Sequence, residues 1–210
     1  MNLPVSYSDV FNVNKHNFNE IALEIFRYQA QENAVYRKFL DHLTGNPEEI
    51  THYSNIPFLP IELFKKHQVI SGNWVTESTE YFESSSTTGL NTSKHYINDP
   101  AWYYHSFTSG FERVYGSIND WCIMAMLPNY LENEHSSLIA MVDQLIKLSE
   151  NENSGYYLDE DDSLDSRLKY NESQGKKTLL IGVSFALIDL TLSFKESFNH
   201  LTILETGGMK

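Results

Sequence analysis

The first strong pattern along the chain is helical. Apolar side chains recur at helical spacing between Ile21 and Leu43, which predicts one long helix with an apolar face. Asn17 and Glu20 have the spacing of a capping box, in which the side chain of each residue accepts a hydrogen bond from the backbone N–H of the other. We therefore expect the helix to begin at Asn17 and to end at the Gly-Asn-Pro sequence of residues 45–47.

Beyond residue 66, short strand-like runs alternate with helical ones. Trp121–Leu127 is apolar throughout and has the length of one strand, which is typical of a strand buried on both faces of a parallel sheet. Asp99 and Pro100 form an N-cap followed by a proline at the first helical position, so a helix should start there. Ser136 should cap the helix that follows the apolar strand. The other expected elements are a short helix from Pro60 to Phe64, a helix at 184–194, and strands at 68–71, 79–82, 93–97, 156–158, 178–183 and 201–204.

This alternation predicts an α/β fold. Residues 1–66 are expected to form a helical amino-terminal layer. Residues 67–210 should form an α/β part on a mostly parallel sheet that also holds one or two antiparallel strands. Because ligands bind at the carboxyl ends of parallel strands, the functional site is expected among residues that follow the predicted strands.

Composition and charge exclude several classes of function. The chain has 210 residues, with 15 Lys+Arg against 28 Asp+Glu and a formal net charge of −13. This charge argues against non-specific binding to DNA, RNA or an anionic membrane surface. The amino terminus lacks the pattern of a secretory signal, and no apolar run approaches the ~18 residues of a membrane span. We expect a cytoplasmic protein with no nucleic-acid partner and no membrane span.

The cysteine, histidine and acidic residues do not suggest a metal site. Cys122 is the only cysteine, so it cannot form an intramolecular disulfide, and a buried small hydrophobic residue is its expected role. The 8 histidines include no pair at the zinc-binding spacing of four residues with a glutamate. The acid-rich stretch from Glu150 to Glu172 lacks the alternating oxygen ligands of a calcium loop, and we interpret it as solvated surface.

The strongest chemical candidate is a polar segment between two predicted strands. Residues 84–89 have the sequence SSSTTG and are followed by Lys94. Small hydroxyl side chains and unhindered backbone N–H groups are the donors that phosphate oxygens need. The segment is not a Walker-type loop, and an ordinary polar turn is the alternative. His95 could also reach a phosphate, although a locally hydrogen-bonded strand residue is its expected role. The candidate phosphate-binding residues are Ser84, Ser85, Ser86, Thr87, Thr88 and Gly89.

This segment resembles the phosphate loop of the adenylate-forming enzymes, which is usually written S-[ST]-G-T-T-G and is followed by a lysine. Four further segments occur in a matching order, namely SKHYINDPAWYYHS, LPNYLENEHSSLIAMVDQLI, LLIGVSFALIDL and ETGGMK. Together they make residues 56–210 resemble the acyl-protein synthetases, whose best-known members supply fatty acid to the bacterial bioluminescence reductase. Ser86 stands where the family pattern commonly has glycine, and a side chain there would weaken a close approach of phosphate.

The resemblance implies a ligase. A carboxylic acid, in this family a fatty acid, would be activated with Mg-ATP to an acyl-adenylate and then transferred to a thiol of an acyl acceptor or partner reductase. The phosphate-binding residues would hold the β- and γ-phosphates, and Lys94 would be a catalytic positive charge. Tyr130 would line the acyl site, with a loop tyrosine packed over the sheet edge as the alternative. Gly207 and Gly208 would approach the nucleotide, or would simply form a tight turn.

Two other hypotheses stay open. The family is more than half as long again, so we expect the chain to be the front portion of a larger enzyme, and alone it could be an inactive folding or binding module or a homo-oligomer. The second hypothesis is a serine hydrolase. Gly182-Val183-Ser184-Phe185-Ala186 resembles a nucleophile elbow, with Asp189 and His200 following in the right order. A plain helix N-cap is the alternative role of Ser184.

Overall fold

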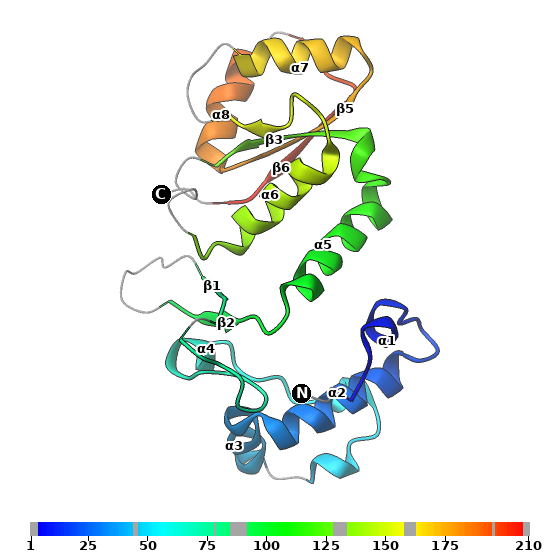
Figure 1. The fold of residues 1–210 in the computed structure, drawn as a ribbon, viewed down its shortest axis with the longest axis vertical. Coiled ribbons are helices and arrows are strands. Elements are labelled where there is room, and N and C mark those ends of the chain that lie inside the picture. Colours follow the sequence, from blue (N-terminus) through cyan, green and yellow to red (C-terminus); the bar gives the residue numbers. More distant parts are fainter. Residues whose placement is uncertain are drawn as a thin grey trace. The chain divides into compact units, whose positions relative to one another are not determined.

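The computed structural model describes residues 4–43, 46–77, 79–84, 92–127, 134–157, 163–194 and 196–207. The chain forms two compact units, Met1–Trp102 and Tyr103–Lys210 (Figure 1). The first is mainly helical with a small antiparallel ribbon, and the second contains a parallel sheet with helices. The α/β fold is therefore confirmed, whereas a division of the chain after residue 66 stays a prediction.

The first unit has a small core between two helices. Its helices are α1 (Tyr7–Phe11), α2 (Phe18–Glu32), α3 (Ala34–His42) and α4 (Leu63–Lys66), with 3₁₀ turns η1 (Pro47–Glu49) and η2 (Tyr53–Asn55). Phe26 of α2 and Tyr36 of α3 are both buried in this core. The Tyr36 hydroxyl donates to the carbonyl of Pro57 at 2.6 Å, which ties the loop before α4 to α3. Burial raises the pKa of Tyr36 to about 12, so the hydroxyl stays a donor at neutral pH.

The prediction of a single long helix between residues 17 and 43 is wrong, because the helix is interrupted at Asn33. The Asn33 backbone is extended (φ −98°, ψ 104°), and its side-chain oxygen accepts a hydrogen bond from the Tyr36 N–H at 3.0 Å. Asn33 therefore ends α2 and caps α3. The apolar spacing continues through this point, so the spacing alone could not reveal the break.

The capping box expected at Asn17 is also wrong. The helix α2 does begin after Asn17, but Asn17 has a helical backbone and makes no side-chain hydrogen bond to the helix. Its side-chain oxygen accepts from the N–H of Asn14 at 2.7 Å instead. A turn upstream therefore uses the acceptor that would have capped α2. A capping box is formed at Ser6 and Asp9, where α1 begins.

The ribbon of the first unit consists of β1 (Tyr81–Glu83) and β2 (Lys94–Tyr96), which pair antiparallel. Both strands were expected. The strand expected at 68–71 is wrong, because these residues are all described and none is in a strand. A strand needs a hydrogen-bonded neighbour, and β1 pairs with β2 rather than with this segment.

The second unit is built on four parallel strands in the order β4-β3-β5-β6. They are β3 (Trp121–Met126), β4 (Gly155–Tyr156), β5 (Lys177–Gly182) and β6 (Leu201–Glu205). Its helices are α5 (Pro100–Tyr115, which begins at the end of the first unit), η3 (Ile118–Asp120), α6 (Ser137–Ser149), α7 (Ser163–Ser173) and α8 (Ser184–Ser193). The antiparallel strands expected in this sheet are wrong, since antiparallel pairing among the described strands occurs in the separate ribbon.

The helix starts of this unit follow the sequence closely. The Asp99 carboxylate accepts from the Ala101 N–H at 2.9 Å, as expected for an N-cap followed by a proline. The Ser136 hydroxyl accepts from the Ile139 N–H at 3.3 Å, so Ser136 caps α6 as predicted. Both helices therefore begin where side chains satisfy backbone N–H groups of the first turn.

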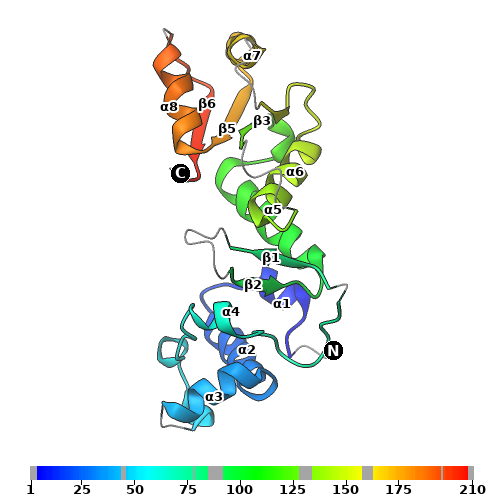
Figure 2. The ribbon, with the colours of Figure 1, turned by 90° about the vertical axis from the view of Figure 1, so that its left-hand side faces the viewer.

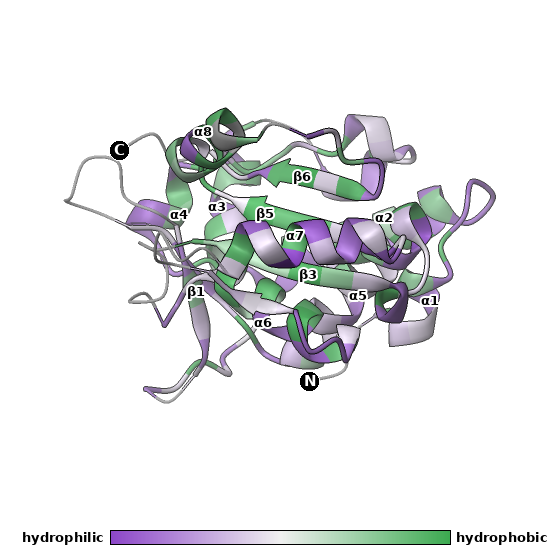
Figure 3. Ribbon diagram, turned by 90° about the horizontal axis from the view of Figure 1, so that it is seen from above, coloured by the Kyte–Doolittle hydropathy of each residue, from purple (hydrophilic) through white to green (hydrophobic). Residues whose placement is uncertain are grey.

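The sheet lies between two layers of helices (Figures 1 and 2). Side chains of α5 and α6 pack on one face, around Val142 and Ile181, and those of α7 and α8 pack on the other, around Leu168 and Leu180. The residues from Cys122 to Ala125 in β3 are 0% exposed, which confirms a strand buried on both faces. Figure 3 shows that β5 is likewise hydrophobic over most of its length.

Gly182, at the end of β5, allows α8 to pack closely. A Cβ at this position would lie 2.8 Å from Cγ and Cδ2 of Leu187 and 3.3 Å from Cβ of Met126. We predict that Gly182→Ala lowers the free energy of unfolding by about 1–3 kcal/mol, because the buried Leu187 has to shift. Urea denaturation would measure this change.

The matched control is Gly110→Ala in α5, where an added Cβ meets nothing within 4 Å. This substitution should raise the free energy of unfolding by about 0.5–1 kcal/mol, because alanine favours a helix interior over glycine. A Gly182→Ala variant that is as stable as the unsubstituted chain would contradict the close packing of α8 on β5.

Candidate functional site

The strand order of the second unit points to one edge of its sheet as the position where a ligand would bind. The chain leaves β3 through α6 towards β4 on one side, and it leaves β5 through α8 towards β6 on the other side. When neighbouring strands send their connections in opposite directions, a crevice opens outside their carboxyl ends, and ligands bind there in open α/β sheets. In this sheet that point lies between Met126, where β3 ends, and Gly182, where β5 ends.

The described residues at this edge form a hydrogen-bonded cluster. The N–H of Val183 donates to the carbonyl of Met126 at 3.3 Å. The hydroxyl of Ser184, at the start of α8, donates to the carboxylate of Glu205 at the end of β6. The same carboxylate oxygen accepts from the N–H of Gly207 at 2.9 Å. Strand ends and a helix start that are separate in sequence are thus joined by one backbone hydrogen bond and by the Glu205 carboxylate.

Gly207 lies at the sheet edge where the sequence predicted it. Its φ is +77°, in the left-handed region that favours glycine. Gly208 and Tyr130 lie outside the described residues, so their expected roles stay predictions. Tyr130 comes three residues after Leu127, which directly follows β3.

The predicted phosphate segment connects the two strands of the ribbon in the first unit. Glu83 pairs with Lys94 at the end of this ribbon. Beyond them, the Ser84 N–H donates to the Ser93 carbonyl at 3.1 Å, and the Ser84 hydroxyl accepts from the Ser93 N–H at 3.1 Å. Ser84 therefore closes the base of the connection. Ser85, Ser86, Thr87, Thr88 and Gly89 lie outside the described residues.

Lys94 carries a stable positive charge beside this connection. Its ammonium lies 3.6 Å from Oε1 of Glu83 and 4.3 Å from the centre of the Tyr81 ring. The hydrogen bond with Tyr81, and to a smaller degree the charge of Glu83, raises the pKa of Lys94. A lysine with a raised pKa is protonated at neutral pH, so it can stabilise negative charge but cannot act as a general base.

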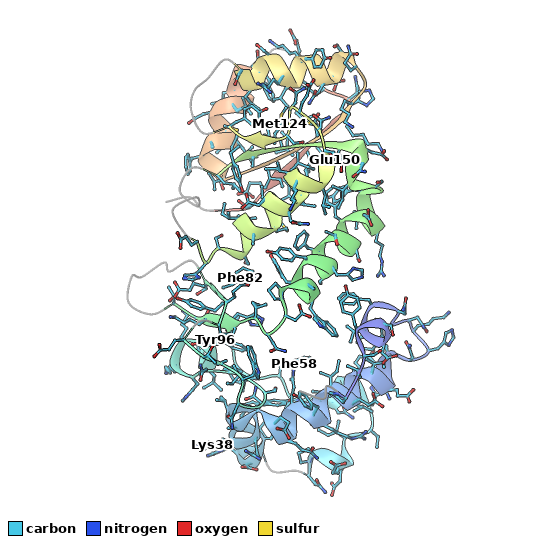
Figure 4. The ribbon with its side chains drawn as sticks, viewed as in Figure 1. Lys38, Phe58, Phe82, Tyr96, Met124 and Glu150 are labelled. Carbon is cyan, nitrogen blue, oxygen red and sulfur yellow. The ribbon has the colours of Figure 1, made fainter. Side chains whose placement is uncertain are left out.

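A pocket of about 580 Å³ lies over one face of the ribbon. Tyr81, Lys94 and Tyr96 line it from the ribbon, and the segment before β1 lines it with Thr76 and Glu77. The opposite face of the ribbon carries Phe82 and His95, which pair with each other across the strands; Figure 4 labels Phe82 and Tyr96.

His95 is directed away from this pocket. Because successive side chains of a strand point to opposite faces, His95 and Lys94 lie on opposite faces of the ribbon. The His95 ring stacks on Phe64 of α4, with ring centres 6.4 Å apart. This contact favours a local structural role for His95.

The residues of the serine hydrolase hypothesis are not brought together. Ser184 follows the carboxyl end of β5, whereas the carbonyl of His200 accepts from the Thr178 N–H at the opposite end of that strand. At about 3.3 Å per strand residue, the four steps from Thr178 to Gly182 already put about 13 Å between these two ends of β5. Asp189 is exposed on α8. A Ser-Asp-His triad is therefore not formed.

Cys122 has the structural role that the sequence predicted. It is 0% exposed, and its sulfur accepts from the Ser154 hydroxyl at 3.8 Å. Burial raises the pKa of its thiol. A buried neutral thiol is a poor nucleophile, so Cys122 is not a candidate acyl acceptor.

Sequence reasoning missed two residues of these sites. Tyr81 supports Lys94, and its position two residues before Glu83 on a strand was the available signal. Glu205 belongs to the ETGGMK segment that supports the resemblance, but its contact with Ser184 joins residues 21 positions apart. Such a contact depends on the pairing of β5 with β6.

Two features are absent from the described ranges of the chain. No group of three or more histidine, cysteine, aspartate or glutamate side chains in these ranges is arranged to hold a metal ion. No helix in the same part of the chain is long and apolar enough to cross a membrane.

Comparison with known proteins adds no family to this description. No model of a known protein family matches the chain, and no curated protein or solved structure matches it either.

The burial of Cys122 predicts that its thiol reacts slowly in the folded protein. In the native state at pH 8, we expect it to react with a disulfide reagent such as DTNB about a thousandfold more slowly than in denaturant, because exposure requires opening of the core. The rate of thionitrobenzoate release measures this ratio. A fast reaction of the native protein would contradict the observed burial.

The raised pKa of Cys122 also predicts a pH dependence. Above about pH 8.5, the ordinary pKa of cysteine, the unfolded state loses the thiol proton while the folded state keeps it. The associated stability is present below that pH and is lost as the pH rises towards the folded-state pKa. Between pH 7.5 and 9.5 the unsubstituted chain should therefore lose more free energy of unfolding than Cys122→Ala, as measured by urea denaturation at each pH. Equal losses would contradict this prediction.

Proposed function

We propose that this protein binds ATP at the β1–β2 ribbon and activates a carboxylic acid of the fatty-acid class as an acyl-adenylate, which then reacts with a thiol. The observation that carries the proposal is the position of Lys94. It is the first residue of β2, directly after the Ser84–Ser93 closure, and it lines the pocket. The residues that precede it resemble the phosphate loop of adenylate-forming enzymes.

Local charge supports this assignment. The chain as a whole carries −13, so a tetra-anionic nucleotide would have to be attracted by groups close to it. Lys94 is fixed by Tyr81 and Glu83, and its side chain keeps 43% exposure. A fixed cation that still meets solvent can pair with an incoming phosphate without large rearrangement. The Lys94 ammonium would then contact both the Glu83 carboxylate and the phosphate of the ligand.

The proposed reaction has two steps. A carboxylate oxygen attacks the α-phosphorus of ATP, the bond to the β-phosphate oxygen breaks, and pyrophosphate leaves with the negative charge that Lys94 stabilises. A thiolate then attacks the acyl carbon, and AMP leaves. Cys122 is 0% exposed, so in this proposal the accepting thiol is one other than that of Cys122.

A magnesium ion would accompany ATP in this proposal. Magnesium at such sites is held mostly by phosphate oxygens and water, with one or two carboxylates from the protein. Among the described residues, Glu77 lines the same pocket as Lys94 and Glu83 pairs with Lys94, so these two carboxylates would hold the ion. Bound magnesium would add charge neutralisation to that supplied by Lys94.

Replacement of Lys94 tests the proposal. We predict that Lys94→Ala lowers carboxylate-dependent ATP–pyrophosphate exchange by about 100-fold or more, the usual effect of removing one preorganised donor for developing charge. Exchange would be measured with carboxylic acids from acetate to tetradecanoate. The matched control is Lys38→Ala, since Lys38 is exposed on α3 (Figure 4) and should not affect exchange.

Three outcomes would contradict the proposal. Equal exchange by the Lys94 and Lys38 variants would exclude Lys94 from the reaction. ATP binding without exchange for any carboxylic acid would favour an inactive binding module. Covalent labelling of Ser184 by a fluorophosphonate, abolished in Ser184→Ala, would favour the hydrolase hypothesis instead.

A further inference from the structure

The strand β6 forms an open edge of the sheet of the second unit. Among the described strands it pairs with β5 alone. The carbonyl of His200 accepts from the Thr178 N–H at 2.8 Å, and the N–H of Thr206 donates to the Gly182 carbonyl at 3.0 Å. Because alternate residues of a strand bond to the same neighbouring strand, even-numbered residues face β5. The residues whose backbone N–H and C=O groups are directed away from β5 are Leu201, Ile203 and Glu205.

This edge lacks the features that protect sheet edges from pairing with another strand. Proteins commonly use very short edge strands, prolines, lysines or bulges for that purpose. The strand at the opposite edge, β4, has 2 residues and is protected by its length. In contrast, β6 pairs with β5 over 5 consecutive residues, and its sequence LTILE contains no proline and no lysine. The backbone of β6 is therefore suited to pairing with a further strand.

Apolar side chains are exposed beside this edge. Leu201 packs with residues of α7 and α8, and side chains two positions apart on a strand share a face. Ile203, which is 42% exposed, therefore lies on the side of the sheet that α8 covers. On α8, which lies next to β6 (Figure 2), Leu192 is 80% exposed. The open edge and an apolar surface thus occur together.

We propose that β6 pairs antiparallel with β6 of a second copy of this chain, in a two-fold symmetric dimer centred on Ile203. The three outward-facing residues are centred on Ile203, so a two-fold axis there brings each outward N–H to an outward C=O. Ile203 then exchanges two hydrogen bonds with the same residue of the second copy, and Leu201 exchanges two with Glu205 at each end. The edge is thus complementary to itself.

The charges along the edge favour this register. The charged side chain of β6 is that of Glu205, and it lies opposite Leu201 of the second copy. The two Glu205 carboxylates are then about 14 Å apart along the strands, so like charges do not face each other. At the centre, the two Ile203 side chains lie directly opposite on one face, and branched apolar pairs at such positions stabilise a sheet.

The size of the contact and the total charge determine its strength. Each copy contributes one strand of 5 residues and a few side chains of α8, which is less than the about 1,200 Å² of total buried surface that stable complexes need. The net charge of −13 on each copy also opposes association. We therefore expect a reversible dimer that salt strengthens, because salt screens the repulsion.

The test is sedimentation equilibrium of the 210-residue chain and its variants, from low micromolar to near-millimolar concentration. Ile203→Lys places two like charges directly opposite each other, and Ile203→Pro removes an outward N–H without removing a bond to β5. Each variant should raise the Kd of the dimer at least about tenfold. The matched control is Val114→Lys, since Val114 is exposed on α5, and its Kd should be unchanged. Urea denaturation establishes that each variant is folded.

Amide hydrogen exchange of the unsubstituted chain tests the register without any variant. At a concentration where nine-tenths of the chains are dimers, exchange at the outward N–H groups of Leu201, Ile203 and Glu205 should slow about tenfold. The N–H groups of Thr202 and Leu204 are already bonded to β5 and should exchange at an unchanged rate.

Four results would overturn the inference. One is a chain that stays monomeric at every concentration and at high salt. Another is a dimer that neither Ile203 variant weakens, because its contact would then lie elsewhere. Outward amides that are already protected in a monomer would mean that another part of the chain covers β6. Growth into larger assemblies would indicate head-to-tail pairing instead of a two-fold axis. None of these results depends on ATP, so they leave the proposed function to its own test.

Discussion

The burial of β3 and β5 on both faces governs the arrangement of the second unit. These two parallel strands pair over six residues, from Trp121 and Lys177 to Met126 and Gly182. Parallel strands cannot be joined by a tight turn, so each connection has to return across the sheet, here as a helix. One connection covers one face and two cover the other, so the direction of the connections reverses between β3 and β5.

The elements of this unit could be predicted because local signals agree with the tertiary structure. The apolar run of β3 matches its complete burial, and Asp99 and Ser136 cap the helices that flank it. The elements of the first unit were harder to predict, because polar side chains there can form hydrogen bonds with more than one nearby backbone group. Asn33 interrupts a continuous apolar spacing with a side-chain hydrogen bond, and Asn17 bonds upstream instead of capping α2. Amino-acid types alone do not say which of these partners is used.

The candidate sites show the same limit. Lys94 and Gly207 could be identified from motifs, because a glycine after a strand and a lysine after a polar segment are recognisable in the amino-acid sequence. Their supports, Tyr81 and Glu205, act through strand register and through contacts between distant residues.

The two faces of the β1–β2 ribbon differ in their chemistry. Its two faces separate a charged, solvent-facing pair of Lys94 and Glu83 from the aromatic contact of His95 with Phe64. A ribbon of three residues per strand can therefore be anchored through one face while the other face holds a charged pair.

The buried sulfur of Cys122 has a practical consequence for experiments on this molecule. Since it is the only cysteine and is 0% exposed, a cysteine introduced at any exposed position becomes the one accessible thiol of the folded protein. A maleimide fluorophore or spin label could then be attached at one chosen site without first removing the native residue. Because packing keeps this sulfur unreactive, any chosen surface position could be labelled selectively.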